Sequence, residues 1–212
     1  MLKNLIFLSF ILLIGLFCLS GCYASKNIDS LAYIVALGID VGERANLKIS
    51  FQITLASNQS SEKSSGSTSQ STSTNTISIE CDSIYSGVSL LNSYLSKKAN
   101  FSHCKAIIFS EELATQGISK YVYTLINDIE IRTNSNVIIC KNNCEYFIKN
   151  SQPLLEQLSA KYYESIQTSD SYTGFTENIQ LKNFFLDLTY KYSSPYAVLG
   201  AVKTNNNNRC GF

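Results

Sequence analysis

Residues 29–40 read Asp-Ser-Leu-Ala-Tyr-Ile-Val-Ala-Leu-Gly-Ile-Asp, and they are almost entirely apolar between the two ends. An apolar run of this length without alternation predicts a strand that is buried on both faces of a sheet. The next stretch, 47–55, alternates as Leu-Lys-Ile-Ser-Phe-Gln-Ile-Thr-Leu, which is typical of a half-buried strand. Gly42 and Asn46 bracket the short connection, so we expect the two strands to form a hairpin.

Beyond this hairpin, short apolar runs alternate with apolar stripes at helical spacing. We expect further strands at 77–80, 106–109, 137–140 and 196–202. We expect helices that start at Asp82 or Ser83 and end at 97–100, that start at Ser110 and end at Gly117, and that span 118–126, 151–166 and 181–188. This alternation predicts an α/β fold, with a mixed β-sheet and flanking helices in a single domain.

Two segments are too polar to contribute to a core. In residues 57–76, thirteen of the twenty residues are Ser or Thr and none is a large apolar residue, so we expect a flexible surface loop. Residues 204–212 include four consecutive Asn residues, and we expect a disordered tail there.

The N-terminus has the pattern of an export signal. One basic residue, Lys3, precedes an apolar run over 5–19 that is short for a transmembrane helix. The run leads into Leu19-Ser20-Gly21-Cys22, which resembles the lipobox of bacterial lipoproteins. The resemblance implies a signal peptide over 1–21 and a Cys22 that carries S-diacylglyceryl and N-acyl groups, which anchor the mature chain in membrane lipid. A plain signal anchor with an incidental cysteine is the alternative.

Composition argues against several classes of function. Charged residues make up only 16% of the chain and the formal net charge is +1, so we expect no nucleic-acid partner. A single histidine excludes a His-rich metal site. We find no phosphate-binding glycine loop, zinc-protease helix or nucleophile elbow. We therefore predict a protein without catalytic residues, cofactor or metal.

The cysteines are the residues best suited to chemistry. Behind Cys22 five remain, an odd number that argues against a complete disulfide framework: Cys81, Cys104, Cys140, Cys144 and Cys210. We interpret most of them as buried thiols that pack as small apolar residues. The spacing of Cys140 and Cys144 leaves a bridge between them open, whereas a zinc site lacks further ligands. His103 and Cys104 are sequence neighbours whose side chains should diverge, so we expect no nucleophilic pair.

Three stretches carry a more specific signal. They are Gly21-Cys22-Tyr23 with Ile28 to Asp40, then Asn100 to Ala114, then Asp128 to Asn134. In order and spacing they resemble the spore germination lipoproteins of the Ger(x)C family. The resemblance implies a C-subunit of a nutrient germinant receptor, non-catalytic and lipid-anchored at the inner spore membrane, on the outer face of the cytoplasmic membrane.

The same resemblance carries expectations about partners and domains. It implies that the subunit acts beside A- and B-type membrane subunits of the receptor. It implies that residues 22–203 form the family's N-terminal domain, and we expect the two further domains usual in the family to be absent from this chain.

Two other classes stay open. A lipid-anchored solute-binding protein of a transporter needs two lobes with a cleft between them, for which one domain is small. A thiol-dependent enzyme would use Cys140 and Cys144, and it would require a depressed thiol pKa. Stabilisation by a bound solute would favour the first class, and a reactive thiol would favour the second.

Overall fold

The computed structural model describes residues 30–54, 74–127, 130–151, 161–165, 173–174, 177–203 and 209–211, with Lys3, Asn4, Ile6, Phe7 and Ser9 near the N-terminus. The chain divides into two units, Met1–Ser30 and Leu31–Phe212. In the first unit, the few residues described have helical backbone. Within the described ranges, no helix combines the length and the apolarity that crossing a bilayer requires.

The hairpin predicted at the start of the domain is confirmed. β1 (Leu31–Val41) pairs antiparallel with β2 (Leu47–Thr54), and across the turn the Gly42 N–H donates to the Asn46 carbonyl, 3.5 Å away. β3 (Thr74–Cys81) pairs antiparallel with the other side of β2. Most of β1 is buried, as its unbroken apolar sequence predicts.

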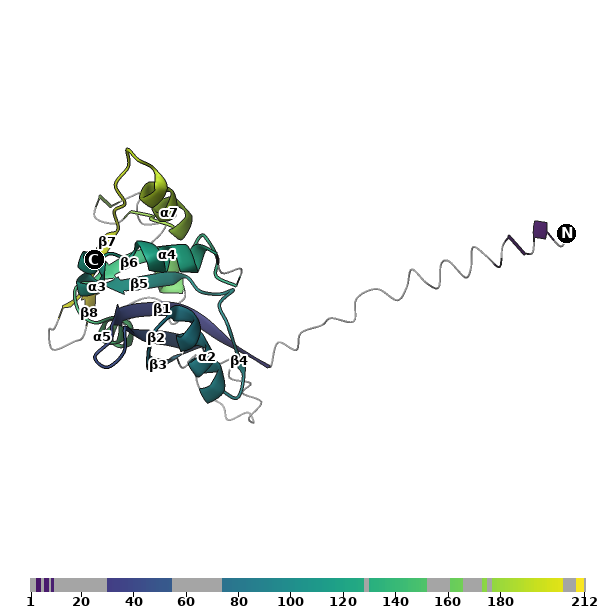
Figure 1. The fold of residues 1–212 in the computed structure, drawn as a ribbon, viewed down its shortest axis with the longest axis horizontal. Coiled ribbons are helices and arrows are strands. Elements are labelled where there is room, and N and C mark those ends of the chain that lie inside the picture. The colour runs from purple at the N-terminus through teal and green to yellow at the C-terminus, as the bar shows by residue number, and fades with distance from the viewer. Residues whose placement is uncertain are drawn as a thin grey trace, which may run out of the picture. The chain divides into compact units, whose positions relative to one another are not determined.

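Parallel strands continue the sheet on the other side of β1. β5 (Ala106–Ser110) pairs with β1, β6 (Asn136–Cys140) with β5, and β7 (Val198–Lys203) with β6. The short β4 (Lys98–Asn100) pairs in parallel with the start of β1, and β8 (Arg209–Gly211) is antiparallel to β7. The strand order β3-β2-β1-β5-β6-β7-β8 confirms the predicted mixed sheet of an α/β fold (Figure 1).

Helices connect these strands and cover the sheet. They are α2 (Ile84–Tyr94), α3 (Glu111–Gln116), α4 (Ser119–Ile126), α5 (Cys144–Asn150) and α7 (Leu181–Thr189), and residues 161–165 are also helical. Ser83 caps α2 in a capping box with Ser86, Ser110 caps α3 and Asn143 caps α5. Gly117 ends α3 at a φ of 100°, which favours glycine. The helix starts predicted at Ser83 and Ser110 are therefore confirmed.

The core has two parts, one on each face of the sheet. Successive residues of β5 point to opposite faces, so that Ile107 belongs to one part and Ile108 to the other. Leu91 of α2 and Leu125 of α4 are fully buried in the first part, and Phe147 of α5 is fully buried in the second. The sheet is thus covered on both faces, as the apolar sequence of β1 requires.

The structure departs from the predicted elements in three places. Helix α2 ends at Tyr94, and Lys98–Asn100, which we predicted to end that helix, form β4 instead. Helix α5 has no counterpart among the predicted elements. Arg209–Gly211 form β8, whereas we expected no structure over 204–212. Strands β4 and β8 form because their backbones pair with β1 and β7, and these pairings cannot be read from the local sequence.

Two predicted segments are only partly covered by the structure. Residues 57–73 of the Ser/Thr-rich loop lie outside the described residues, and the last three positions of that predicted loop belong to β3. Of the helix predicted over 151–166, residues 152–160 also lie outside, while 161–165 are helical.

Candidate functional site

Cys22, the residue predicted to carry lipid, lies outside the described residues, and its modification stays a prediction. The polar and sulfur-bearing side chains that the structure does place gather at two locations. One is the carboxyl end of the parallel strands, where open α/β sheets commonly hold their ligands. The other is the space between α2 and β4.

The first location is a carboxyl-end cluster of Asp40 (β1), Ser110 (β5), Cys140 (β6) and Cys144 (α5). Asp40 is only 4% exposed, and both its carboxylate oxygens accept the Cys144 backbone N–H, at 2.8 and 3.0 Å. Burial raises the pKa of Asp40, while hydrogen bonds from Cys144 and Ser110 and the nearby charge of Lys48 act in the opposite direction. Asp40 therefore joins the end of β1 to the first turn of α5.

The two thiols of this cluster are free and buried. The Sγ atoms of Cys140 and Cys144 are 3.5 Å apart, and neither side chain is exposed. Cys140 Sγ donates to the Asn142 carbonyl at 2.8 Å, and Cys144 Sγ to the Ile108 carbonyl at 3.4 Å. Burial, followed by the contact with Cys140, raises the pKa of the Cys144 thiol well above its usual value. A neutral, buried thiol is a poor nucleophile, so this geometry argues against a thiol-dependent enzyme.

The two other described thiols, those of Cys81 and Cys104, are also buried and have raised pKa values. Cys81 and Cys104 are free and buried in the other part of the core. Burial raises the pKa of Cys104 to about 12 and also raises the pKa of Cys81. For the four cysteines whose side chains are described, the interpretation as buried apolar thiols is confirmed. Within the same residues, no three His, Cys, Asp or Glu side chains are grouped so as to hold a metal ion.

An ion-pair network lies beside the carboxyl-end cluster. Glu145, in the first turn of α5, pairs with Lys48 of β2 at 2.7 Å and with Lys149 one turn further along at 2.5 Å. Hydrogen bonds from Lys149 and Lys48 lower the pKa of Glu145 to about 2. The Glu145 side chain is only 24% exposed, so the network is better shielded from water than an ordinary surface pair. It ties β2 to α5, as Asp40 ties β1 to the same helix.

The central stretch of the family resemblance forms a turn, a strand and a helix cap. Asn100 Oδ1 accepts the Ser102 N–H at 3.0 Å and also accepts the Ser102 hydroxyl. Ser102 Oγ lies 3.0 Å from His103 Nδ1, and the His103 ring contacts Tyr33 edge-on with 4.8 Å between ring centroids. His103 is exposed whereas Cys104 is buried, so the two side chains diverge as predicted. The polar residues of this stretch therefore shape the entry to β5.

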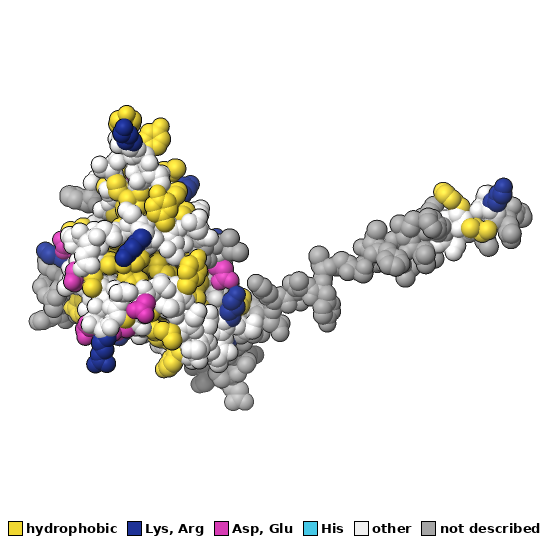
Figure 2. Space-filling view, in the orientation of Figure 1, with side chains coloured by type: hydrophobic (Ala, Val, Ile, Leu, Met, Phe, Trp, Pro, Cys, Tyr) yellow, Lys and Arg dark blue, Asp and Glu magenta, His cyan; other side chains and the backbone are white. Residues whose placement is uncertain are grey.

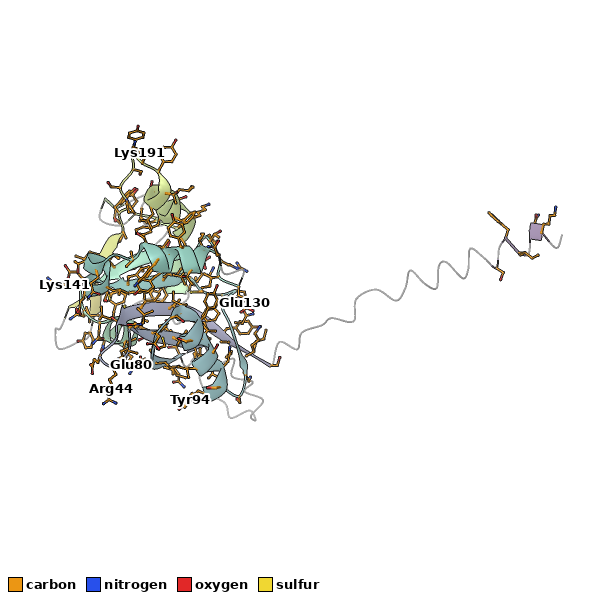
Figure 3. All side chains as sticks on the ribbon, viewed as in Figure 1. Arg44, Glu80, Tyr94, Glu130, Lys141 and Lys191 are labelled. Atoms are coloured by element: carbon orange, nitrogen blue, oxygen red, sulfur yellow. The ribbon has the colours of Figure 1, made fainter. Side chains whose placement is uncertain are left out.

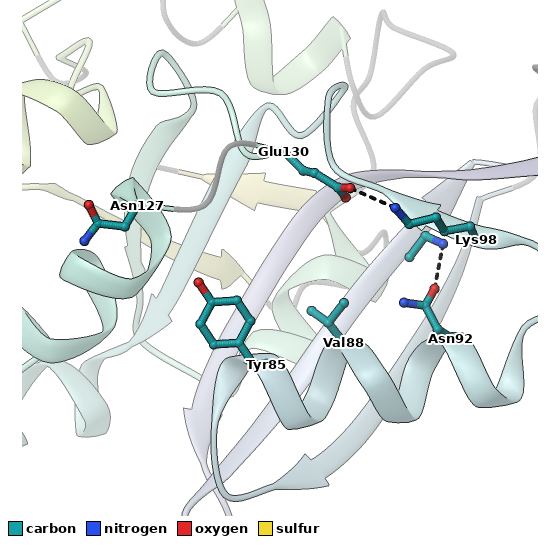
Figure 4. A pocket seen from close by; sticks show the side chains of 7 residues that line it. Tyr85, Val88, Asn92, Lys98, Asn127 and Glu130 are labelled. Carbon is teal, nitrogen blue, oxygen red and sulfur yellow. Dashed lines mark hydrogen bonds and ion pairs between the residues drawn. The ribbon is translucent and has the colours of Figure 1, made fainter. Parts of the chain in front are cut away.

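The second location is a pocket of about 350 Å³ between α2 and β4 (Figure 4). Its walls are formed by Tyr85, Val88, Asn92, Lys98, Ala99, Asn127 and Glu130. Lys98 Nζ and the Glu130 carboxylate lie 2.9 Å apart, and Asn92 Oδ1 accepts the Ala99 N–H at 2.8 Å. These bonds join β4 to α2 and to the loop after α4. The space-filling view shows hydrophobic and uncharged side chains over most of this side of the domain, with scattered charges (Figure 2).

Fold and side-chain clusters together define an α/β domain in which carboxylates, amides and lysines hold strands to helices. The family model of the spore germination protein N-terminal domain matches residues 24–202. The chain therefore belongs to this family of spore germination proteins, the Ger(x)C family, as the three sequence stretches predicted.

Two curated relatives support this membership. Over 202 residues, the chain is 23% identical to spore germination protein KC of Bacillus subtilis (strain 168), a match that takes in 92% of this chain and 50% of that protein. Over 188 residues, it is 23% identical to the putative spore germination protein YfkR of the same strain, with 88% of this chain and 47% of that protein covered. The chain spans about half the length of the curated relatives it matches. No solved structure gives a significant match.

Sequence reasoning missed the role of Asp40 and the helix that Asp40 holds. A signal for α5 is present, because Asn143 is a favourable N-cap with Glu145 in the first turn and Lys149 in the last. Nothing local reveals the contact itself, since Asp40 and Cys144 are 104 positions apart in the sequence.

Proposed function

We propose that the protein is a lipid-anchored C-subunit of a nutrient germinant receptor, which supports the nutrient-triggered germination response at the inner spore membrane without catalysing a reaction. The observation that carries this proposal is the family match, which begins at residue 24, directly behind Cys22 of the predicted lipobox. The relatives named above are both described as spore germination proteins.

The anchor in this proposal is Cys22, modified with S-diacylglyceryl and N-acyl groups. Each buried CH₂ of an acyl chain contributes about 0.8 kcal/mol, so several chains hold a soluble domain durably on a bilayer. On the outer face of the cytoplasmic membrane, the domain would lie beside the A- and B-type membrane subunits of the receptor.

The non-catalytic part of the proposal is supported by the state of the titratable groups. The described thiols are buried, and burial raises the pKa values of Cys104 and Cys144. An activated thiol nucleophile needs the opposite, a lowered pKa. Asp40 and Glu145 are both engaged in bonds that position α5. These side chains therefore have structural tasks that account for their burial and pairing.

Among the residues that the structure describes, no feature favours the transporter alternative. A solute-binding protein closes two lobes around its ligand. Here Leu31–Phe212 forms one compact unit, and the pocket between α2 and β4 lies within it.

The experiment that tests the proposal compares two single-cysteine changes in the N-terminal segment. Cys22→Ala should release the protein from spore membranes and slow nutrient-triggered germination, while germination triggered without nutrient stays normal. Cys18→Ala, the same change within the predicted signal peptide, should alter neither location nor germination. A Cys22→Ala protein that stays membrane-bound and fully active would overturn the anchor, and normal nutrient germination after gene deletion would overturn the receptor role.

A further inference from the structure

One end of the domain carries exposed cations beside an exposed aromatic ring. The parallel strands β1, β4, β5 and β6 all begin toward this end, so the loops that precede them meet there. We call it the amino-end surface and define it by Tyr94, Lys97, Lys98 and Arg132. The ion pair of Lys98 with Glu130 shows that the loop before β6 reaches back to β4 (Figure 4).

The side chains of the amino-end surface are available to a partner. Tyr94 is 77% exposed and the Lys98 side chain 58% exposed, and Lys97 and Arg132 are also exposed. The Glu130 carboxylate is held by Lys98, whereas no ion pair among the described residues involves Lys97 or Arg132. The surface therefore presents positive charge next to an amphipathic ring, a combination that suits an anionic membrane interface.

The length of chain between the proposed anchor and the domain limits how far this end can lie from the membrane. Cys22 and Leu31 are nine positions apart, and nine residues span at most about 30 Å even when fully extended. A compact domain of this size has a diameter of roughly 40 Å. Leu31 pairs directly with Lys98, so β1 begins at the amino-end surface, beside β4 (Figure 1). The carboxyl ends of the parallel strands can approach the lipid only if the chain between Cys22 and Leu31 extends along the side of the domain.

We propose that the amino-end surface binds the anionic lipid headgroups of the membrane in which Cys22 is anchored. This inference rests on the proposed anchor and adds an orientation to it, because it places the side of the domain that carries Tyr94 nearest the bilayer. Tyr94 and Lys191 lie on opposite sides of the domain in the view of Figure 3. Each Lys or Arg close to an anionic surface strengthens binding by about fivefold, and the tyrosine adds an interfacial contact.

The test uses the mature chain, residues 22–212, produced without lipid, since Leu31–Phe212 forms one compact unit with its own core. Flotation with vesicles of phosphatidylglycerol and phosphatidylcholine at low salt measures binding, with pure phosphatidylcholine vesicles as the neutral reference. We expect binding to the anionic vesicles that weakens as salt is added. The double variant Tyr94→Ser/Lys97→Glu should lower this binding by about fivefold or more.

The matched control makes the same chemical changes in the turn after α7, where Lys191 lies far from Tyr94 (Figure 3). Tyr192, 87% exposed, and its exposed neighbour Lys191 allow the variant Tyr192→Ser/Lys191→Glu, which has the same change in charge and should bind as the parent does. Circular dichroism of both variants confirms that each is folded. Equal loss in the two variants, or no preference for anionic vesicles, would overturn the proposal. Because the chain carries no lipid here, failure of this test is distinct from failure of the anchor at Cys22.

Discussion

Gly38 of β1 faces helix α5 at close range, and its replacement by alanine gives a sharp test of this packing. A Cβ at this position would lie 2.5 Å from Cys144 Cβ and 3.0 Å from Ile148 Cδ1. Ordinary contacts of this kind begin at 3.4 Å, so Cys144 must retreat by about 0.9 Å, the difference between 3.4 and 2.5 Å. Cys144 belongs to the first turn of α5, and the whole helix must move with it.

The cost of this movement has two parts. Overpacking of a close-packed core costs about 1 to 3 kcal/mol. The same retreat stretches the bonds from the Cys144 N–H to Asp40, now 2.8 and 3.0 Å, beyond hydrogen-bonding distance. A hydrogen bond to a charged group contributes about 1.5 to 3 kcal/mol. Small shifts of the surrounding residues reduce both costs, so the total is smaller than the sum of the two upper values. We therefore expect Gly38→Ala to lower the free energy of unfolding by about 3 kcal/mol.

Urea unfolding of the unlipidated mature chain, followed by far-UV circular dichroism, measures this loss. Gly174→Ala is the control, because a Cβ there meets nothing within 4 Å, and it should change stability by less than about 0.5 kcal/mol. Cys144→Gly removes the clashing Cβ and should cost less in the Gly38→Ala background than in the parent. If Gly38→Ala is as stable as Gly174→Ala, helix α5 does not pack on β1 as described.

Three further predictions concern charge, thiols and capping. Glu145→Gln should lower the free energy of unfolding by about 1 to 2 kcal/mol at neutral pH. Because the folded protein lowers the pKa of Glu145 to about 2, the stabilisation by the carboxylate is present above pH 4.5 and is lost as the pH falls toward 2. Urea titrations of parent and variant should therefore converge in acid, and a pH-independent difference would contradict this prediction. Cys104 and Cys144, buried and with raised pKa values, should react with an alkylating reagent only as fast as the domain opens, and rapid labelling of the native protein would show that they are accessible. Ser83→Ala should lower the thermal midpoint through the loss of about 1 kcal/mol of capping, whereas Ser89→Ala, inside α2, should not lower it.

Local patterns were sufficient for the parts of the fold that depend on nearby residues. The unbroken apolar run of β1 and the alternating apolar residues of β2 predict the hairpin, because the burial of each strand follows from the order of its own apolar and polar residues. Ser83 and Ser110 predict helix starts, because a cap acts within three residues. The lipid site at Cys22, which stays a prediction, rests likewise on a motif confined to four residues.

Contacts between distant segments could not be predicted in this way. Lys98–Asn100 have no strand pattern of their own, and they become β4 because the start of β1 offers an unpaired edge. Residues 209–211 pair with β7 for the same reason. The Asp40 carboxylate and the Cys144 N–H meet only after the sheet has formed, so neither residue alone indicates the contact. The pairings of Lys98 with Glu130 and of Lys48 with Glu145 likewise follow from the fold.

The central claim is that a germination-family domain is anchored by lipid at Cys22 in the membrane of the dormant spore. The most direct test is mass spectrometry of the N-terminal peptide Cys22–Lys26, released by trypsin from the membrane fraction of dormant spores. We predict a peptide that begins at Cys22 and carries a diacylglyceryl group and an acyl chain. An unmodified Cys22, a peptide still joined to Gly21, or the absence of the protein from spore membranes would contradict the claim.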